Sequence, residues 1–509
     1  MADQDIVADY AFGTAGEAAG AKRPAAAVEH LDVLIVGAGL SGIGAGYHLQ
    51  ARCPGLSYAL LETRGTIGGT WDLFRYPGIR SDSDMYTLGY SFRPWVGAKS
   101  IADGPSILNY VRETAQEFGI DRRIHFNHRV RQASWSSAEA RWLIEAERTD
   151  TGEPVRLTCG FLLMCSGYYN YAGGHAPEFP GSERFHGQVV HPQFWPGDLD
   201  YAGKRVVVIG SGATAVTIVP EMAKTAAHVT MLQRSPTYIV SRPSEDKAAD
   251  WLRKRLPAKL AYRVARVKNM ALGMYFYHLA RKNPEKTKQQ IIAMARHALG
   301  PDYDVGTHFT PSYNPWDQRL CLVPDSDLFN AIRTGQASVS TGHIETFTET
   351  GIRLRSGEEI EADIVVMATG LKLNLLGDVG LSVDGSKVDL SKALAYKGMM
   401  FSGVPNLASV IGYTNASWTL KADITCEYVC RLLNHMKRRG HVAATPRRDP
   451  AVEEEPFFSL TSGYVQRGVG MMPKQGSKRP WKLHRNYAMD AVALRFGRVA
   501  DGTMEFVRR

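Results

Sequence analysis

Two glycine-rich turns, each directly after a short apolar run, constrain this 509-residue chain most strongly. One reads Gly37-Ala38-Gly39-Leu40-Ser41-Gly42 and the other Gly210-Ser211-Gly212-Ala213-Thr214-Ala215. A helix-like run follows each turn, and strand, tight turn and helix in that order are typical of dinucleotide-binding sites. Glycine lets the backbone approach a pyrophosphate, and the helix N-terminus stabilises its charge. The chain therefore predicts an α/β protein with two Rossmann-like dinucleotide-binding domains in series.

The two halves differ in the residue that follows their second predicted strand. Tyr58–Leu61 is followed by Glu62, whereas Val229–Gln233 is followed by Arg234 and Ser235. A carboxylate accepts hydrogen bonds from an unmodified ribose and repels a 2′-phosphate, while a cation binds that phosphate. The first site is therefore predicted to hold FAD or NAD(H), and the second NADP(H). Opposite preferences exclude a simple dehydrogenase with one cofactor.

Composition narrows the class of protein further. With 509 residues, 44% of them hydrophobic, the chain can bury more than one core, and its net charge is +9. Its six cysteines form no Cys-x-x-Cys pair, which is typical of reduced thiols in a cytoplasmic protein, and we assign no metal site. Residues 1–29 are rich in Ala and Gly without the features of a signal peptide, so we expect a disordered tail. No apolar run is long enough to span a bilayer.

Three further segments carry a family pattern. Phe185, Gly187, His191, Trp195 and Pro196 have the spacing Phe-x-Gly-x-x-x-His-x-x-x-Trp-Pro. Upstream of them stand Gly68-Gly69-Thr70-Trp71, then Tyr76-Pro77-Gly78, then Asp82; downstream stands Tyr313-Asn314-Pro315-Trp316-Asp317-Gln318-Arg319-Leu320-Cys321. These segments resemble the signatures of the type I Baeyer–Villiger flavin monooxygenases, and most closely those of the ethionamide-activating subgroup. The resemblance covers roughly Leu31 to Arg509.

This resemblance implies that FAD binds at the first turn and NADPH at the second. The residues expected to contact FAD are Gly37, Gly39, Ser41, Gly42, Glu62, Thr70, Trp71, Asp72, Leu73, Asp82 and Val130. Those expected to contact NADP(H) are Arg80, Ser81, Ser211, Gly212, Ala213, Thr214, Ala215, Arg234 and Ser235.

The resemblance also implies a catalytic pair. Arg319 falls where the family has its essential arginine, whose fixed cation can stabilise negative charge that develops beside the flavin. Asp82 would orient Arg319. Many relatives have a Lys in contact with the NADPH phosphate where this chain has Gln318, so more of that binding is expected to fall to Arg234. His191 is expected to couple the two domains and not to transfer a proton.

The implied activity inserts one oxygen atom of O2 next to a ketone carbonyl to give an ester or lactone, and also oxidises sulfides or thioamides. A flavin-containing N/S-monooxygenase, or a long-chain hydroxylase without ketone activity, is the alternative. A pyridine-nucleotide disulfide reductase shares the two-domain plan but needs a cysteine pair that Thr63–Thr70 lacks. The last alternative is a dinucleotide-binding or membrane-associated sensor without enzymatic activity.

Apolar strands that end at Gly167 and Gly370 look like crossovers between the domains. They predict that the FAD-binding domain consists of residues 30–167 and 371–509. The NADP-binding domain would consist of 168–240, which include the fingerprint linker, and 313–370. Residues 241–312 would form a helical insertion in the NADP-binding domain.

The insertion carries the excess positive charge. Between Lys247 and Arg296, thirteen Lys and Arg stand against Asp250 and Glu285, a net of +11 that exceeds the +9 of the whole chain. Nucleic acid is not expected to bind there, because no recognition motif accompanies the charge.

Helical periodicity within the insertion is clear. Apolar residues recur at Leu260, Val264, Val267, Ala271 and Met274, with Lys259, Arg263 and Arg266 beside them. We expect this stripe to pack on the core and leave a solvated basic face. Peripheral contact with anionic lipid is the alternative.

Overall fold

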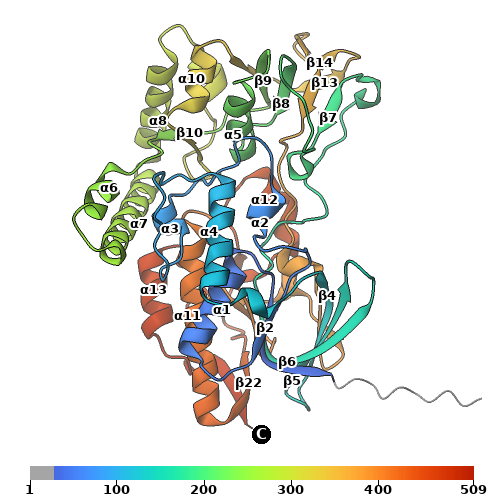
Figure 1. Cartoon of the computed structure of the whole chain (residues 1–509), viewed down its shortest axis with the longest axis vertical. Helices are drawn as coiled ribbons and strands as arrows, with labels where there is room; N and C mark the ends of the chain where they lie inside the picture. Colours follow the sequence, from blue (N-terminus) through green and yellow to red (C-terminus); the bar gives the residue numbers. More distant parts are fainter. Residues whose placement is uncertain (1–27, 509) are drawn as a thin grey trace, which may run out of the picture.

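The computed structural model describes residues 28–508, so almost all of the predicted tail lies outside the described residues. Two separate sheets form the body of the molecule, one in the lower half of Figure 1 and one in the upper half. Each glycine turn follows a central strand of one sheet. The predicted α/β class with two Rossmann-like units is thus what the chain adopts.

The lower sheet holds the first glycine turn. Its parallel part has the order β21-β6-β1-β2-β3, and β5, β4, β17 and β18 extend it from the other half of β6. The strands are β1 Glu29–Val36, β2 Tyr58–Leu61, β3 Ile124–His125, β4 His128–Ser136, β5 Arg141–Arg148, β6 Pro154–Met164, β17 Gly380–Val383, β18 Ser386–Lys387 and β21 Leu407–Ser409. The first strand thus begins two residues before the predicted Leu31.

Both faces of this sheet are covered, which explains the unbroken apolar runs in its strands. Val33 and Ile35 pack among residues of helices α1 (Leu40–Arg52) and α11 (Trp418–Arg439), while Leu34 packs with the β4–β6 side. Helix α11 ends at Gly440, whose φ of 67° is the left-handed conformation that glycine adopts without strain. Two further helices, α4 Gly104–Glu117 and α13 Tyr487–Phe496, pack against α1 and α11.

The upper sheet holds the second glycine turn. Its five strands are all parallel in the order β12-β9-β8-β16-β7. Their bounds are β7 Gln188–Val190, β8 Arg205–Ile209, β9 His228–Gln233, β12 Ala337–Thr341 and β16 Ile364–Val366. Helices α5 Ala213–Met222 and α10 Asp327–Arg333 pack beside it, and a small antiparallel sheet follows, with β13 Ile344–Phe347, β14 Gly351–Leu354 and β15 Glu359–Glu361.

Two chain passages that lie side by side connect the sheets. The passage out follows β6, the passage back follows β16, and Tyr169 and Leu373 pair as antiparallel bridge partners. The backbone amides of Asn170 and Asn374 donate to the carbonyls of Lys372 and Tyr168, each over 2.9 Å. The two sheets are therefore joined through one short antiparallel ribbon.

The basic insertion is helical, with α6 Lys247–Arg253, α7 Ala258–Lys282, α8 Pro284–Leu299 and α9 Val305–Phe309. It lies between strands β10 Ile239–Arg242 and β11 Cys321–Pro324, which pair in parallel. In Figure 1, α6 and α7 form the left edge of the molecule. Helix α7 packs against α3 (Met85–Leu88), a short helix of the first sheet's part of the chain.

The expected orientation of α7 is wrong. Its buried face consists of Ala261, Tyr262, Ala265, Arg266 and Ala280. The apolar stripe that begins at Leu260 faces solvent, except for its half-buried last residue Met274. Arg266 can be buried because its hydrogen bonds are satisfied, which is the condition for placing a charge in a core.

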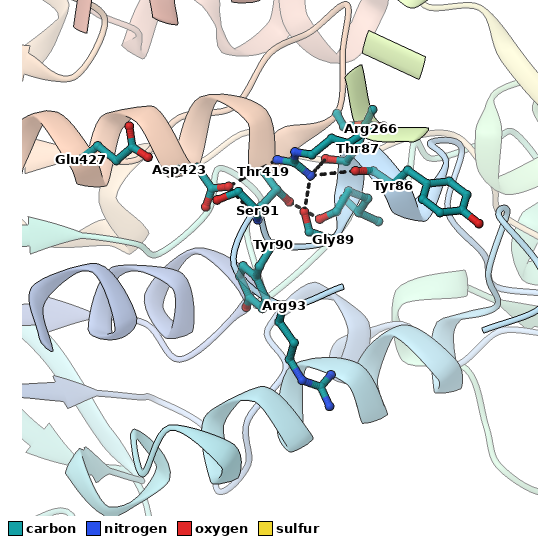
Figure 2. Close-up of polar contacts among 12 residues, drawn as sticks. Tyr86, Thr87, Gly89, Tyr90, Ser91, Arg93, Arg266, Thr419, Asp423 and Glu427 are labelled. Atoms are coloured by element: carbon teal, nitrogen blue, oxygen red, sulfur yellow. Dashed lines mark hydrogen bonds and ion pairs between the residues drawn. The ribbon is translucent and has the colours of Figure 1, made fainter. Parts of the chain in front are cut away.

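Figure 2 shows how Arg266 is held. Its Nη1 donates to the carbonyls of Tyr86 and Gly89 over 2.8 and 2.7 Å, and its Nη2 donates to Asp423 Oδ2 on α11 over 3.3 Å. Asn269, one turn further on, donates to Asp84 over 3.0 Å. Polar contacts thus fasten the inner face of α7 to the segment around α3.

The remaining elements are short and lie around these units. They are α2 Thr70–Leu73, α12 Gly463–Gly468, β19 Ala395–Tyr396, β20 Met400–Phe401, β22 His441–Pro446, β23 Glu454–Pro456, β24 Lys474–Gly476 and β25 Met504–Arg508. Short 3-10 helices span Asp121–Arg123, Ser182–Arg184, Pro192–Phe194, Leu375–Asp378, Leu390–Lys392 and Val469–Met471. Within residues 28–508, every helix is too short or too polar to cross a bilayer. All six cysteines are free and buried.

Candidate active site

One cavity of about 960 Å³ is lined by both glycine turns, so the two predicted nucleotide sites open into a shared space. Most of the predicted site residues line it. They are Gly37, Gly39, Ser41, Glu62, Thr70, Trp71, Arg80, Ser81, Asp82, Val130, Ser211, Gly212, Ala213, Thr214, Arg234, Ser235 and Arg319.

Four predicted cofactor residues lie outside the lining, namely Gly42, Asp72, Leu73 and Ala215. Gly42 has a packing role, because a Cβ atom there would lie 1.9 Å from the carbonyl oxygen of Gly37. The buried carboxylate of Asp72 pairs with three arginines, Arg64, Arg75 and Arg112. Asp72 therefore organises the wall behind the cavity and does not face it.

Glu62 is held at the first turn by backbone donors. The amides of Ala38 and Arg64 donate to its two carboxylate oxygens over 2.7 and 2.9 Å. Burial raises the pKa of Glu62, and these two hydrogen bonds offset part of that effect. The carboxylate also lines the cavity, where its remaining lone pairs fit ribose hydroxyl groups and repel a phosphate.

The second turn faces two arginines that are not neutralised. Arg234 follows β9, and Arg467 reaches the same cavity from α12; among residues 28–508 neither forms an ion pair. Desolvation and then the charge of Arg234 lower the pKa of Arg467, as expected for two cations near each other. Two such cations fit a phosphate group. Arg80, in contrast, is already paired with Asp327, with Nη1 2.5 Å from Oδ2.

Arg319 and Asp82 come together in this cavity from opposite parts of the chain. Arg319 lies just before β11 of the insertion's small sheet, and Asp82 lies between α2 and α3. Their side chains form an ion pair with Nη2 2.6 Å from Oδ2. The charge of Asp82 raises the pKa of Arg319, so the guanidinium stays charged at every working pH.

Aromatic side chains surround this ion pair, and sequence reasoning missed them. Tyr168, Tyr169, Trp418 and Tyr464 line the cavity, and the rings of Tyr168 and Trp418 stack with centroids 5.1 Å apart. Burial raises the pKa of Tyr169 to about 12, so its hydroxyl stays protonated. The first two directly follow the crossover glycine Gly167, a position that could have drawn attention to them.

The fingerprint residues lie away from the cavity, beside the passage between the sheets. His191 Nδ1 accepts from the amide of Gln193 over 3.2 Å, and its ring packs so closely on Gly174 that a Cβ there would lie 2.1 Å from Cε1. Burial lowers the pKa of His191, which keeps the imidazole neutral. Phe185 packs on Phe347 of β13, and Trp195 packs against the core of the upper sheet. Pro196, the last residue of the fingerprint, also lies outside the cavity lining.

Two Rossmann-like units that share a cavity, with a charged arginine held by a carboxylate between them, define an oxidoreductase with two dinucleotide sites. The chain belongs to the flavin-binding monooxygenase-like family, whose model matches residues 101–404. A model of an NAD(P)-binding Rossmann-like domain matches residues 35–97. The chain is accordingly a flavin monooxygenase, which confirms the family and the enzyme class predicted from its motifs.

Relatives match nearly the whole chain. The FAD-containing monooxygenase EthA of Mycobacterium tuberculosis is 55% identical over 483 residues, which cover 94% of this chain and 98% of that protein. The probable FAD-binding monooxygenase AlmA of Acinetobacter baylyi is 49% identical over 484 residues, 94% of this chain and 97% of that protein. An oxidised steroid monooxygenase bound to NADP has the same fold, with a TM-score of 0.74, 21% identity, and coverage of 94% and 100%.

Proposed function

We propose that the chain is a Baeyer–Villiger monooxygenase that uses FAD and NADPH to insert one oxygen atom of O2 next to a ketone carbonyl. The observation that carries this proposal is the Arg319–Asp82 ion pair inside the cavity lined by both nucleotide turns. Sulfide or thioamide oxidation in the same cavity is part of the proposal, since the same reactive oxygen can pass to sulfur.

The binding residues divide by charge. Gly37, Gly39 and Glu62 would hold FAD, with the helix N-terminus of α1 toward the pyrophosphate. Arg234 and Arg467 would hold the 2′-phosphate of NADP(H). When both are bound, the flavin accepts hydride from NADPH and activates O2, which is chemistry that no protein side chain can supply.

The protein contributes a fixed positive charge and a wall that excludes water. The guanidinium of Arg319 is permanently charged and is oriented by Asp82, so it stabilises negative charge as it develops on oxygen during transfer. The aromatic rings of Tyr168 and Trp418 would cover the reacting atoms and limit the escape of oxidant as hydrogen peroxide.

Product analysis with labelled oxygen tests this function. The FAD-loaded protein is supplied with NADPH and ¹⁸O2 in the presence of linear ketones, cyclic ketones and aryl methyl sulfides. We expect esters or lactones that carry one ¹⁸O atom, and sulfoxides from the sulfides. Hydrogen peroxide in the amount of NADPH consumed, with every ketone left intact, would contradict the proposal. Sulfoxide without any ester would favour the N/S-monooxygenase alternative.

A further inference from the structure

Helix α7 exposes a continuous apolar face that the fold does not use. Leu260, Val264, Val267 and Tyr275 have exposed fractions of 47, 41, 60 and 59%, and their spacing places them on one side of the helix. The opposite side, with Ala261 and the other buried residues, already packs on the molecule. Large apolar side chains that recur on an outward helix face mark an interaction surface.

Basic side chains flank this face. Lys259 and Arg263 are exposed on the same helix, and among the described residues neither forms an ion pair. On α6, Trp251 is 54% exposed and the guanidinium of Arg255 lies 4.3 Å above its ring. The exposed surface of α6, α7 and the short turn between them therefore combines apolar residues, an exposed tryptophan and unpaired cations. That combination is typical of helices that lie in a membrane interface.

We propose that the outer face of α6 and α7 docks the enzyme on an anionic lipid surface, with α7 parallel to the membrane plane. The apolar residues would enter the boundary between headgroups and acyl chains, and Lys259, Arg263 and Arg255 would contact lipid phosphates. A second copy of the chain is a poorer partner, because Lys259, Arg263 and Arg255 would face the same cations of that copy. A lipid surface of opposite charge is attracted.

Docking would place a part of the active-site framework next to lipid. The inner face of α7 holds the carbonyls of Tyr86 and Gly89 through Arg266 (Figure 2). Asn269 on the same helix donates a hydrogen bond to Asp84, which lies two residues from Asp82. The helix that contacts the membrane is thus the helix that supports this segment. Binding to lipid does not depend on the reaction proposed above, so the two proposals can fail separately.

Vesicle flotation of the FAD-loaded full-length protein tests this proposal. One set of vesicles is phosphatidylcholine alone, and the other contains phosphatidylglycerol as the minor component. We expect binding to the anionic set that weakens as salt is raised, and about tenfold weaker binding for Val267→Glu or Arg263→Glu. Val189→Glu is the matched control, because Val189 is 51% exposed on the edge strand β7 of the upper sheet.

Several outcomes would overturn the proposal. The proposal would be overturned if the protein bound neither vesicle set. It would also be overturned if Val267→Glu and Val189→Glu bound anionic vesicles equally well. A wild-type dimer that Val267→Glu converts to monomer in light scattering would assign this face to a second copy of the chain. Flavin content and the rate of NADPH oxidation in detergent-free buffer should be unchanged in Val267→Glu, which shows that the variant is folded.

Discussion

Arg319 and Asp82, which lie on opposite sides of the second glycine turn in the chain, form an ion pair with their charged atoms 2.6 Å apart. About one third of each side chain is open to the cavity, 32% for Arg319 and 30% for Asp82. Because each side chain is still partly open to water in this cavity, the pair contributes less stability than a fully desolvated pair would. Its value lies in holding a cation at a defined point in the cavity.

Replacement of Arg319 by alanine should therefore slow product formation strongly without unfolding the protein. We expect the rate of oxygenated product to fall by a factor of about 100 or more, as for the loss of other charge-stabilising groups. Arg281→Ala is the control, because Arg281 forms a similar ion pair with Asp317 over 2.8 Å outside the cavity. Equal product from the two variants, measured by chromatography, would remove Arg319 from the mechanism.

Glu62→Gln should weaken flavin retention and change the pH dependence of stability. Burial raises the pKa of Glu62 in the folded protein above its ordinary value of 4.5. Between the unfolded and the folded pKa of Glu62, the folded apoprotein therefore binds more protons than the unfolded chain. The stability that wild-type apoprotein has relative to Glu62→Gln should therefore fall as pH rises through that window. Thermal midpoints of both apoproteins from pH 4 upward measure it. Parallel curves would show that Glu62 titrates normally.

Removal of Arg234 or Arg467 should weaken NADP⁺ binding more than NAD⁺ binding. Loss of one charge-assisted hydrogen bond to a phosphate should lower the affinity by about tenfold to a hundredfold. Calorimetric titration of each variant with both nucleotides separates the contribution of the 2′-phosphate from that of the pyrophosphate, which both nucleotides share. An equal loss for both nucleotides in Arg467→Ala would move that side chain to the pyrophosphate.

Gln318→Lys should tighten NADP⁺ binding, because Gln318 lines the same cavity.

Substitution of a fingerprint residue should change the stability of the protein through packing, and not through the reaction. A Cβ atom at Gly187 would lie 2.4 Å from the carbonyl oxygen of Asp363, whereas nothing lies within 4 Å of a Cβ at Gly197. We expect Gly187→Ala to lower the free energy of unfolding by about 1–3 kcal/mol and Gly197→Ala to leave it nearly unchanged. Thermal unfolding followed by flavin release measures both. Equal midpoints would mean that the edge strand β7 adjusts without cost.

The strand, glycine turn and helix of each unit were predicted correctly from the sequence, because these elements are contiguous in the chain. Glu62 and Arg234 line the cavity at the positions that follow the second strand of each unit, while their contacts to FAD and NADP(H) stay predictions. The buried side of α7 could not be assigned in this way. Its apolar stripe satisfies helical periodicity, but the buried side is decided by Arg266, whose three carbonyl partners and Asp423 come from distant segments.

The aromatic wall and Arg467 escaped prediction for a related reason. Tyr168 follows the first crossover, Trp418 begins α11, and Tyr464 and Arg467 lie on α12, so they reach the cavity of Arg319 from segments far apart in the chain. No spacing along the chain encodes that convergence. Asp72 shows the reverse error, since it sits in a family motif beside cavity residues yet turns its carboxylate toward Arg64 and Arg112.

The paired crossovers show that the upper unit is inserted into the sequence of the lower one. The chain leaves after β6, completes the whole upper sheet and the helical insertion, and returns beside the point of departure, where Tyr169 and Leu373 are bridge partners. A domain can be inserted into another domain without disrupting its fold when the two ends of the inserted domain lie close together. The upper unit is therefore an inserted domain, and both of its ends leave the lower domain at one stem.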